Sequence, residues 1–264
     1  MSNHALRLFD NSARGEAGVG GTGPALALAR TSAWRLPLRR WRVGAVPPLL
    51  PQQCALCAAP AGAALVCAAC DAALPRLPTG CPLCALPSPA GAPCGACLKR
   101  PPPFAATRAA FAYAFPVDRL LHALKYRSAL PYVEFLADAL ADAVVAGPQV
   151  VVPMPLHPSR QRERGFNQAQ ELARRVGRRL HMPVVEGLVR TRDTPVQAGS
   201  SKAARRRNMR GAFAALPAVR GCHVALVDDV MTTGATLAEA ARATLAGGAR
   251  SVAAWAVART LPSS

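Results

Sequence analysis

Three features that would define a protein class are missing from this chain of 264 residues. No G-x-x-x-x-G-K-[ST] loop occurs, which excludes a Walker-type nucleotide site. The longest uncharged run, Val43–Cys70, is interrupted by prolines and glutamines and contains four cysteines, which excludes a transmembrane helix. No apolar stretch of signal-peptide length follows a short basic start, so we expect no secretory signal, no membrane insertion and residence in the cytoplasm.

Acidic and aromatic residues are also scarce. Asp and Glu number 14 against 32 Lys and Arg, which gives a net charge of +18, and aromatic residues make up 5% of the chain. The hydrophobic fraction of 51% still suffices for a packed core, although alanine supplies much of it. The five histidines are scattered, and none stands at zinc-ligand spacing from another. The length allows one full domain and one small one.

The segment from residue 224 to residue 237, VALVDDVMTTGATL, has the pattern of a ligand-binding turn. Val224–Val227 predicts a buried parallel strand, and Asp228 and Asp229 follow it, where open α/β sheets bind ligands. Five small residues then let a ligand approach the main chain, and a helix expected from about Leu237 directs its free N–H groups at a phosphate. The five are Thr232, Thr233, Gly234, Ala235 and Thr236.

The two carboxylates need a task other than holding the phosphate, because like charges repel. Asp228 and Asp229 suit ribose hydroxyls or a hydrated divalent cation. One loop would then bind phosphate, sugar and metal. The alternative is an ordinary strand, turn and helix, in which both carboxylates are solvated and Gly234 only makes the turn.

Eight of the nine cysteines form four Cys-x-x-Cys pairs. Each pair can hold a zinc ion from one side, and two pairs complete a tetrahedral shell of four thiolates that leaves no position for water. The sequence therefore predicts two structural zinc ions, whose binding supplies most of the folding free energy of a segment with few large apolar residues. Successive pairs or alternate pairs can share an ion. The eight ligands are Cys54, Cys57, Cys67, Cys70, Cys81, Cys84, Cys94 and Cys97.

Two other interpretations of these cysteines are a disulfide framework and separate redox-active Cys-x-x-Cys motifs. A disulfide framework needs an oxidising compartment, whereas the remainder of the chain has the pattern of a cytosolic enzyme domain. The ninth cysteine, Cys222, stands alone before the strand at Val224, and we expect it to be buried as a small apolar residue.

The remaining sequence divides into a tail and a larger domain. Residues 1–45 show no sustained period of 3.6 or 2 and predict a disordered basic tail. Its cluster Trp34–Arg42 interleaves arginine and tryptophan, which suits nucleic acid or an anionic membrane face; the alternative is an extension without function. Residues 46–100 form the cysteine module, Pro101–Pro103 make a stiff linker, and residues 104–264 predict the α/β domain.

Strand and helix patterns alternate along the first half of this domain. We expect the arginines of its last helix to be solvated. The predicted elements are strands at Phe104–Phe115 and Val150–Val152, helices at Val117–Tyr126 and Tyr132–Val145, and a helix that opens within Arg160–Gln168 and continues through Leu180.

Positive charge gathers after the second of these strands. Residues 151–220 contain fifteen Lys and Arg against four Asp and Glu, which indicates an anionic partner larger than one sugar. His157, Arg160 and Arg164 follow a strand end, where cationic groups suit an anionic ligand, and a surface role is the alternative for each.

A further basic tract, Arg190–Gly211, is rich in small residues and predicts a mobile loop. Such a loop closes over a reactive ligand to exclude water, or it clamps DNA phosphates. The arginines that we assign to this task are Arg205 and Arg207.

The V-D-D-V-M-T-T-G-A-T loop resembles the phosphoribosyl pyrophosphate (PRPP) motif of type I phosphoribosyltransferases. With the cysteine pairs ahead of it, the chain resembles the ComF/GntX family over residues 47–260. Ser200 stands where the family usually has leucine, which bears on the packing of the basic loop. Three further segments carry the resemblance: L-K-Y-R at Leu124–Arg127, V-P-M-P-L-H at Val152–His157 and R-E-R-G-F-N-Q at Arg162–Gln168.

The resemblance implies an α/β fold, with a type I phosphoribosyltransferase-like parallel sheet flanked by helices and preceded by a small double zinc-ribbon module. It implies transfer of a 5-phosphoribosyl group from PRPP with Mg²⁺, with Thr232–Thr236 on the 5-phosphate and Asp228 and Asp229 as the catalytic pair on the ribose. In such a site His157, Arg160 and Arg164 would contact the pyrophosphate leaving group. The acceptor is not specified.

The resemblance also implies a biological setting. ComF-type proteins act in the cytoplasm in natural transformation, on incoming single-stranded DNA and with a competence helicase as partner. Two other classes of function remain open for the chain. One is a non-catalytic PRPP-sensing or DNA-binding protein, and the other is a nucleobase-salvage phosphoribosyltransferase.

Overall fold

The computed structural model describes residues 52–127, 130–144, 147–192 and 209–262. The predicted tail at 1–45, Ser200 and the loop residues Arg205 and Arg207 lie outside these ranges. Contacts divide the chain into Met1–Val46 and Pro47–Ser264, and the description below concerns the second unit. Within the described ranges, no helix has the length and hydropathy of a membrane-spanning segment.

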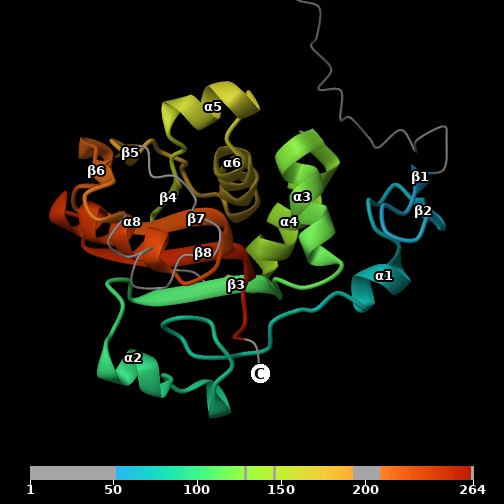
Figure 1. Ribbon diagram of the computed structural model, residues 1–264, viewed down its shortest axis with the longest axis horizontal. Coiled ribbons are helices and arrows are strands. Elements are labelled where there is room, and N and C mark those ends of the chain that lie inside the picture. The colour runs from blue at the N-terminus through green and yellow to red at the C-terminus, as the bar shows by residue number, and fades with distance from the viewer. Residues whose placement is uncertain (1–51, 128–129, 145–146, 193–208, 263–264) are drawn as a thin grey trace, which may run out of the picture. The chain divides into compact units, whose positions relative to one another are not determined.

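The centre of this unit is a parallel sheet of four strands, in the order β3-β8-β7-β4 (Figure 1). The strands are β3 (Ala106–Ala112), β4 (Val150–Pro153), β7 (His223–Met231) and β8 (Ser251–Arg259). Every neighbouring pair is parallel. The sheet and its helices confirm the predicted α/β class.

The sheet is buried on both faces. Along β7, Val224 and Leu226 belong to one hydrophobic cluster and Ala225 and Val227 to the other, because successive side chains point to opposite faces. This double burial explains why the strand is continuously apolar rather than alternating. The first face packs against α8 (Ala235–Ala246) and the hairpin of β5 (Leu188–Arg190) and β6 (Phe213–Ala215), and the second against α3 (Val117–Arg127), α4 (Leu130–Ala143) and α6 (Gln168–Leu180).

Two helices on the second face are joined by ion pairs. The carboxylates that recur every four residues on α4 meet arginines of α6, whose face we expected to be solvated. Arg175 lies 2.9 Å from Asp138 and 3.4 Å from Glu134. Arg179 lies 3.1 Å from Asp142. Such partly exposed pairs contribute at most about 1 kcal/mol each, so they fix the alignment of the helices more than they stabilise the fold.

Three predicted boundaries were wrong. Strand β7 continues through Met231, so Asp228 and Asp229 lie inside it rather than after it, because β8 runs equally far and keeps pairing with it. Helix α8 begins at Ala235, ahead of the predicted start near Leu237.

The third correction concerns the helix expected from Arg160 through Leu180. It is two helices, α5 (Pro158–Arg164) and α6. Gly165 ends α5 in the left-handed conformation, with φ of 74°. The side chain of Asn167 then accepts a hydrogen bond from the N–H of Ala169 at 3.0 Å and caps α6.

The cysteine module consists of short elements. They are β1 (Gln52–Gln53) paired with β2 (Pro60–Gly62), α1 (Ala68–Ala72), the 3-10 turn Pro89–Gly91 and α2 (Gly95–Lys99). A second 3-10 turn, Pro217–Val219, precedes β7.

The module also covers the outer edge of β3. The N–H of Leu77 donates to the carbonyl of Ala110 at 3.0 Å, and the N–H of Thr107 donates to the carbonyl of Pro82 at 2.7 Å. The Thr107 hydroxyl donates to the Leu83 carbonyl at 2.8 Å. These bonds satisfy a strand edge that would otherwise remain open. The predicted boundary between a module at 46–100 and a domain at 104–264 stays a prediction.

Candidate functional site

The acidic pair occupies the carboxyl-terminal part of β7. Asp228 and Asp229 are both half-buried. The Asp228 carboxylate accepts the N–H of Asp229 at 2.9 Å, and the Asp229 carboxylate accepts the N–H of Val230 at 2.7 Å. Each carboxylate therefore accepts the N–H of the next residue, and its oxygens are of the kind to which hydroxyls donate and which divalent cations bind.

A tight turn joins β7 to α8. Gly234 is buried and has φ of 76°, a left-handed conformation that favours glycine because other residues are strained in it. The Thr233 hydroxyl accepts the N–H of Ala235 at 3.3 Å. Thr232 is exposed at the tip. The predicted small residues thus form one turn that leads into a helix N-terminus, where N–H groups and the helix dipole favour an anion.

The loop after β4 starts beside the acidic pair. The N–H of Met154 donates to the carbonyl of Val227 at 2.9 Å, immediately before Asp228. The side-chain amide of Asn167 donates to the Met154 carbonyl at 3.1 Å. Asn167 therefore holds this loop to the start of α6, a positioning role that sequence reasoning did not assign to it.

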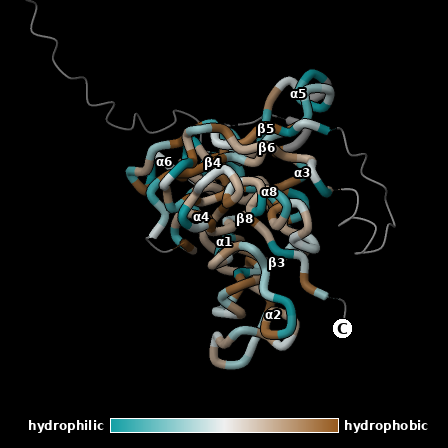
Figure 2. Tube along the Cα trace, turned by 90° about the vertical axis from the view of Figure 1, so that its left-hand side faces the viewer, coloured by the Kyte–Doolittle hydropathy of each residue, from teal (hydrophilic) through white to brown (hydrophobic). Residues whose placement is uncertain are grey.

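The cationic residues that were predicted to lie near the ligand differ in their positions and contacts. The ring Nδ1 of His157 lies 2.7 Å from the Ser159 hydroxyl and accepts the Ser159 N–H at 3.3 Å, so His157 caps α5. Arg160 is half-buried on α5, a helix whose residues are mostly hydrophilic, as the teal colouring in Figure 2 shows. Arg164 ends α5, and its side chain lies outside the described set, as do Arg205 and Arg207.

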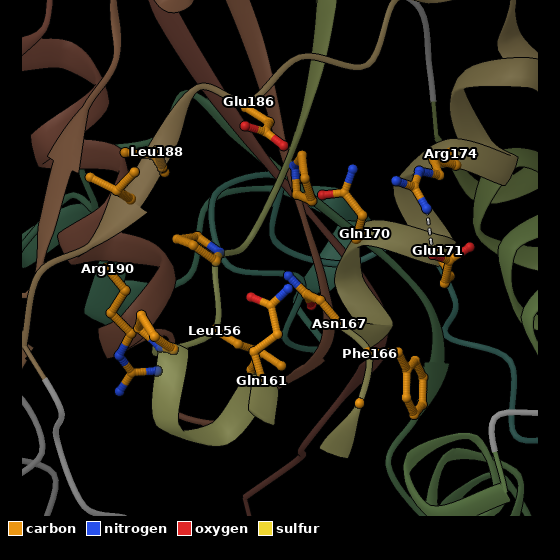
Figure 3. A pocket seen from close by; sticks show the side chains of 15 residues that line it. Leu156, Gln161, Phe166, Asn167, Gln170, Glu171, Arg174, Glu186, Leu188 and Arg190 are labelled. Carbon is orange, nitrogen blue, oxygen red and sulfur yellow. Dashed lines mark hydrogen bonds and ion pairs between the residues drawn. The ribbon is translucent and has the colours of Figure 1, made fainter. Parts of the chain in front are cut away.

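A pocket of about 470 Å³ opens at the carboxyl end of β4. In Figure 3, Leu188 and Arg190 of β5 lie on one side of it, and Glu171 and Arg174 of α6 lie on the other. Pro153, which lines it, pairs with Val227 of β7. The pocket and the acidic pair are thus at the ends of neighbouring strands. Its polar lining includes Gln161, Asn167, Gln170 and Glu186.

The eight paired cysteines lie in two groups of four, and successive pairs form each group. Within a group all four sulfur atoms lie within 4.8 Å of one another. The Sγ atoms of Cys57 and Cys67 are 3.7 Å apart, as are those of Cys84 and Cys94. A tetrahedron with Zn–S distances of about 2.3 Å has edges of roughly 3.8 Å, so both groups fit zinc. We call residues 54–70 the first ribbon and residues 81–97 the second ribbon.

The electrostatics of each ribbon also favour a cation. The N–H of Cys67 lowers the pKa of Cys54 to about 6. Burial opposes ionisation of Cys81, but the N–H groups of Cys94, Leu83 and Cys84 lower the pKa of this thiol to about 6. By contrast, hydrogen bonding with the thiols of Cys57 and Cys67 raises the pKa of Cys70 to about 12. Each ribbon therefore has one thiol with a lowered pKa, and metal binding displaces protons from thiol ligands.

A residue that sequence reasoning missed lies under the β7–α8 turn. Arg259 ends β8 and is 5% exposed. Its guanidinium donates to the carbonyls of Met231 and Thr232 on one side and to that of Cys84 on the other. The available signal was a single charged residue at the end of an otherwise apolar strand.

Comparison with known proteins defines the class of this chain. A double zinc ribbon domain model matches residues 45–98, and a phosphoribosyl transferase domain model matches residues 162–261. The DNA utilization protein YhgH of Escherichia coli K12 is 36% identical over 173 residues, which cover 62% of this chain and 76% of the relative. Competence protein F of Haemophilus influenzae is 34% identical over 156 residues, or 58% and 65% of the two chains.

These matches identify a zinc-ribbon protein with a phosphoribosyltransferase domain. The chain belongs to the ComF/GntX family, as predicted. Similar solved structures include the glutamine PRPP amidotransferase of Bacillus subtilis, with a TM-score of 0.33 and 21% identity over 46% of this chain and 25% of that one. TT1426 of Thermus thermophilus has a TM-score of 0.29 and 20% identity over 52% and 84%.

Proposed function

We propose that the chain binds PRPP with Mg²⁺ at the β7–α8 turn and transfers or senses its phosphoribosyl group in the handling of incoming single-stranded DNA. The observation that carries the proposal is the buried Gly234 turn, which leads from two carboxylates into a helix N-terminus. The 5-phosphate lies on the amides of Thr232–Thr236, and Asp228 and Asp229 hold the ribose hydroxyls.

In a transfer reaction the bond between C1 of the ribose and the pyrophosphate oxygen breaks, the oxygen keeps the electron pair, and an acceptor forms a new bond to C1. Mg²⁺, when bound, neutralises charge on the diphosphate, and the carboxylates of Asp228 and Asp229 are oxygen ligands of the kind it prefers. Cationic groups stabilise the leaving pyrophosphate. They are His157 in the loop after β4, Arg160 and Arg164 on α5, and Arg205 and Arg207 in the basic tract.

The pocket beside β4 is suited to the acceptor. Its volume lies in the range of small-molecule sites, and its carboxylates, amides and guanidinium groups can hydrogen-bond a polar molecule such as a nucleobase. A salvage enzyme would need the same pocket but not the net charge of +18. The names of the relatives, which refer to competence and DNA utilization, favour DNA as the larger anionic partner.

Calorimetry tests the core of the proposal. Zinc-loaded protein with Mg²⁺ is expected to bind PRPP at micromolar concentration, and ribose 5-phosphate more weakly, because it lacks the diphosphate. Pyrophosphate release in the presence of nucleobases or a DNA strand would establish transfer, whereas binding without release would establish the sensor. Absence of PRPP binding by folded protein refutes both forms.

Titration with a single strand at several salt concentrations tests the DNA partner. Affinity is expected to fall steeply with salt, and Arg205→Ala and Arg207→Ala are each expected to reduce the slope by about 1 if that arginine contacts a phosphate. Arg119→Ala, which removes a cation of α3, serves as the control. Equal slopes for all these proteins remove the basic tract from the DNA interface.

A further inference from the structure

Arg259 forms hydrogen bonds with both the β7–α8 turn and the second ribbon, two parts of the molecule to which the proposed function assigns separate roles. On one side, Nη1 donates to the carbonyl of Met231 at 2.9 Å and to that of Thr232, the first residue of the phosphate turn. On the other side, Nε donates to the carbonyl of Cys84 at 2.9 Å, and Cys84 is a ligand of the second ribbon. A single planar group therefore bridges the phosphate turn and a metal centre.

The environment of Arg259 makes this bridge difficult to break. The side chain is 5% exposed, and Nη1 also donates to the carbonyl of Thr260 at 2.9 Å, so the guanidinium exchanges water for main-chain carbonyls. Burial lowers the pKa of Arg259, and the thiolates of Cys84, Cys97 and Cys94 oppose that shift. Four thiolates around one Zn²⁺ carry net negative charge, so the metal centre itself favours a cation at this position.

The two ribbons differ in their contact with Arg259. In the part of the chain that the structure describes, no hydrogen bond joins Arg259 to the first ribbon, whose Leu56 instead packs beside the α3–α4 side of the sheet. The second ribbon contributes Ala85 to the other cluster, which also contains Met231 and Leu237 of the turn region. The first ribbon is therefore an internal control for any effect transmitted through Arg259.

We propose that Arg259 is a positioning residue that couples the second zinc centre to the phosphate turn. Zinc on the second ribbon holds the Cys84 carbonyl, the carbonyl holds the guanidinium, and the guanidinium holds Met231 and Thr232 in the form that receives a phosphate. Coupling between two sites is reciprocal, so a ligand on the turn stabilises zinc on the second ribbon. The identity of that ligand as PRPP rests on the proposed function, whereas the coupling does not.

Hydrogen exchange of the full chain tests the coupling without a ligand. Arg259→Lys keeps the charge but cannot reach carbonyls on both sides, because an ammonium is a point donor and not a planar fork. Amides of residues 231–236 and 81–97 are expected to exchange at least about tenfold faster in this variant. Amides of residues 54–70 and of the β7 core at 224–227 keep the wild-type rate. Arg250→Lys, at an exposed arginine, is the matched control.

Zinc release tests the reciprocal effect. Alkylation of cysteines freed by a chelator shows which ribbon has lost its metal. PRPP with Mg²⁺ is expected to slow release from the second ribbon of the wild type several-fold, to leave the first ribbon unchanged, and to have no such effect in Arg259→Lys.

The outcomes separate the two proposals. If residues 231–236 of the Arg259→Lys variant exchange at the wild-type rate, the coupling is overturned. It is also overturned if exchange becomes faster evenly over the sheet and both ribbons, because that indicates general destabilisation. PRPP that binds but protects both ribbons equally, or neither, also overturns it. If PRPP does not bind at all, the proposed function fails, and the exchange rates in residues 231–236 still decide the coupling.

Discussion

Replacing Asp228 and Asp229 together by asparagine is expected to weaken binding of PRPP with Mg²⁺ by at least about 100-fold, since each hydrogen bond to a charged group contributes about 1.5–3 kcal/mol. Asparagine keeps the size of the side chain and an oxygen that can accept the neighbouring N–H, as both carboxylates do. The substitution therefore removes the charge and leaves the local geometry. Calorimetry with PRPP and Mg²⁺ measures the loss.

A matched control exists at the start of α3. The carboxylate of Asp118 accepts the N–H of Arg119 at 2.8 Å, the same local bond that Asp228 makes, but Asp118 stands outside the candidate site. Asp118→Asn is expected to leave PRPP affinity unchanged. If the double variant binds PRPP within about threefold of the wild type, the acidic pair does not recognise the sugar or the metal, and the assignment of this site is wrong.

The parts of this fold that could be predicted are those determined by local sequence. A continuous run such as Val224–Val227 indicates burial on both faces, and two Cys-x-x-Cys pairs contain the whole ligand set of one zinc ion. Which pairs share an ion could not be predicted, because that depends on how the chain folds back. The contact of Cys57 with Cys67 settles it for the first ribbon.

The corrections have two origins, a contact between distant segments and a local capping pattern. Strand β7 is longer than its apolar run because β8 pairs with it beyond Val227. The break between α5 and α6 was encoded locally by Gly165 and Asn167, whose capping pattern was overlooked.

Two further features depend on contacts between distant segments and could not be predicted from the sequence. Arg259 and Cys84 are far apart in the chain, and nothing local indicates that a carbonyl in the second ribbon accepts a hydrogen bond from the end of β8. Likewise, Asp138 and Arg175 each belong to a charged helix face that also occurs on solvated helices. Cys222, which we expect to be buried, is half-buried and packs against the hydrophobic cluster that contains Val224 and Leu226.

Removing zinc is expected to unfold both ribbons while the parallel sheet persists. Structural zinc sites bind with about 10–16 kcal/mol, comparable to or above the total stability of a domain, which is about 5–15 kcal/mol. The ribbons have few large apolar side chains of their own, whereas the strands of the sheet are buried on both faces. Metal analysis should find two zinc ions per chain, and a strong chelator should remove both.

Thiol reactivity checks this expectation residue by residue, because zinc-bound thiolates are protected and Cys222 is not a ligand. The zinc-loaded chain is expected to react rapidly at Cys222 alone and the stripped chain at all nine cysteines. Added Zn²⁺ should restore protection, whereas Mg²⁺ should not, because it prefers oxygen ligands. A stripped chain whose eight paired thiols remain protected would show that the ribbons fold without metal. Pairs that are oxidised in freshly purified protein would instead support the disulfide framework, and with it an oxidising compartment.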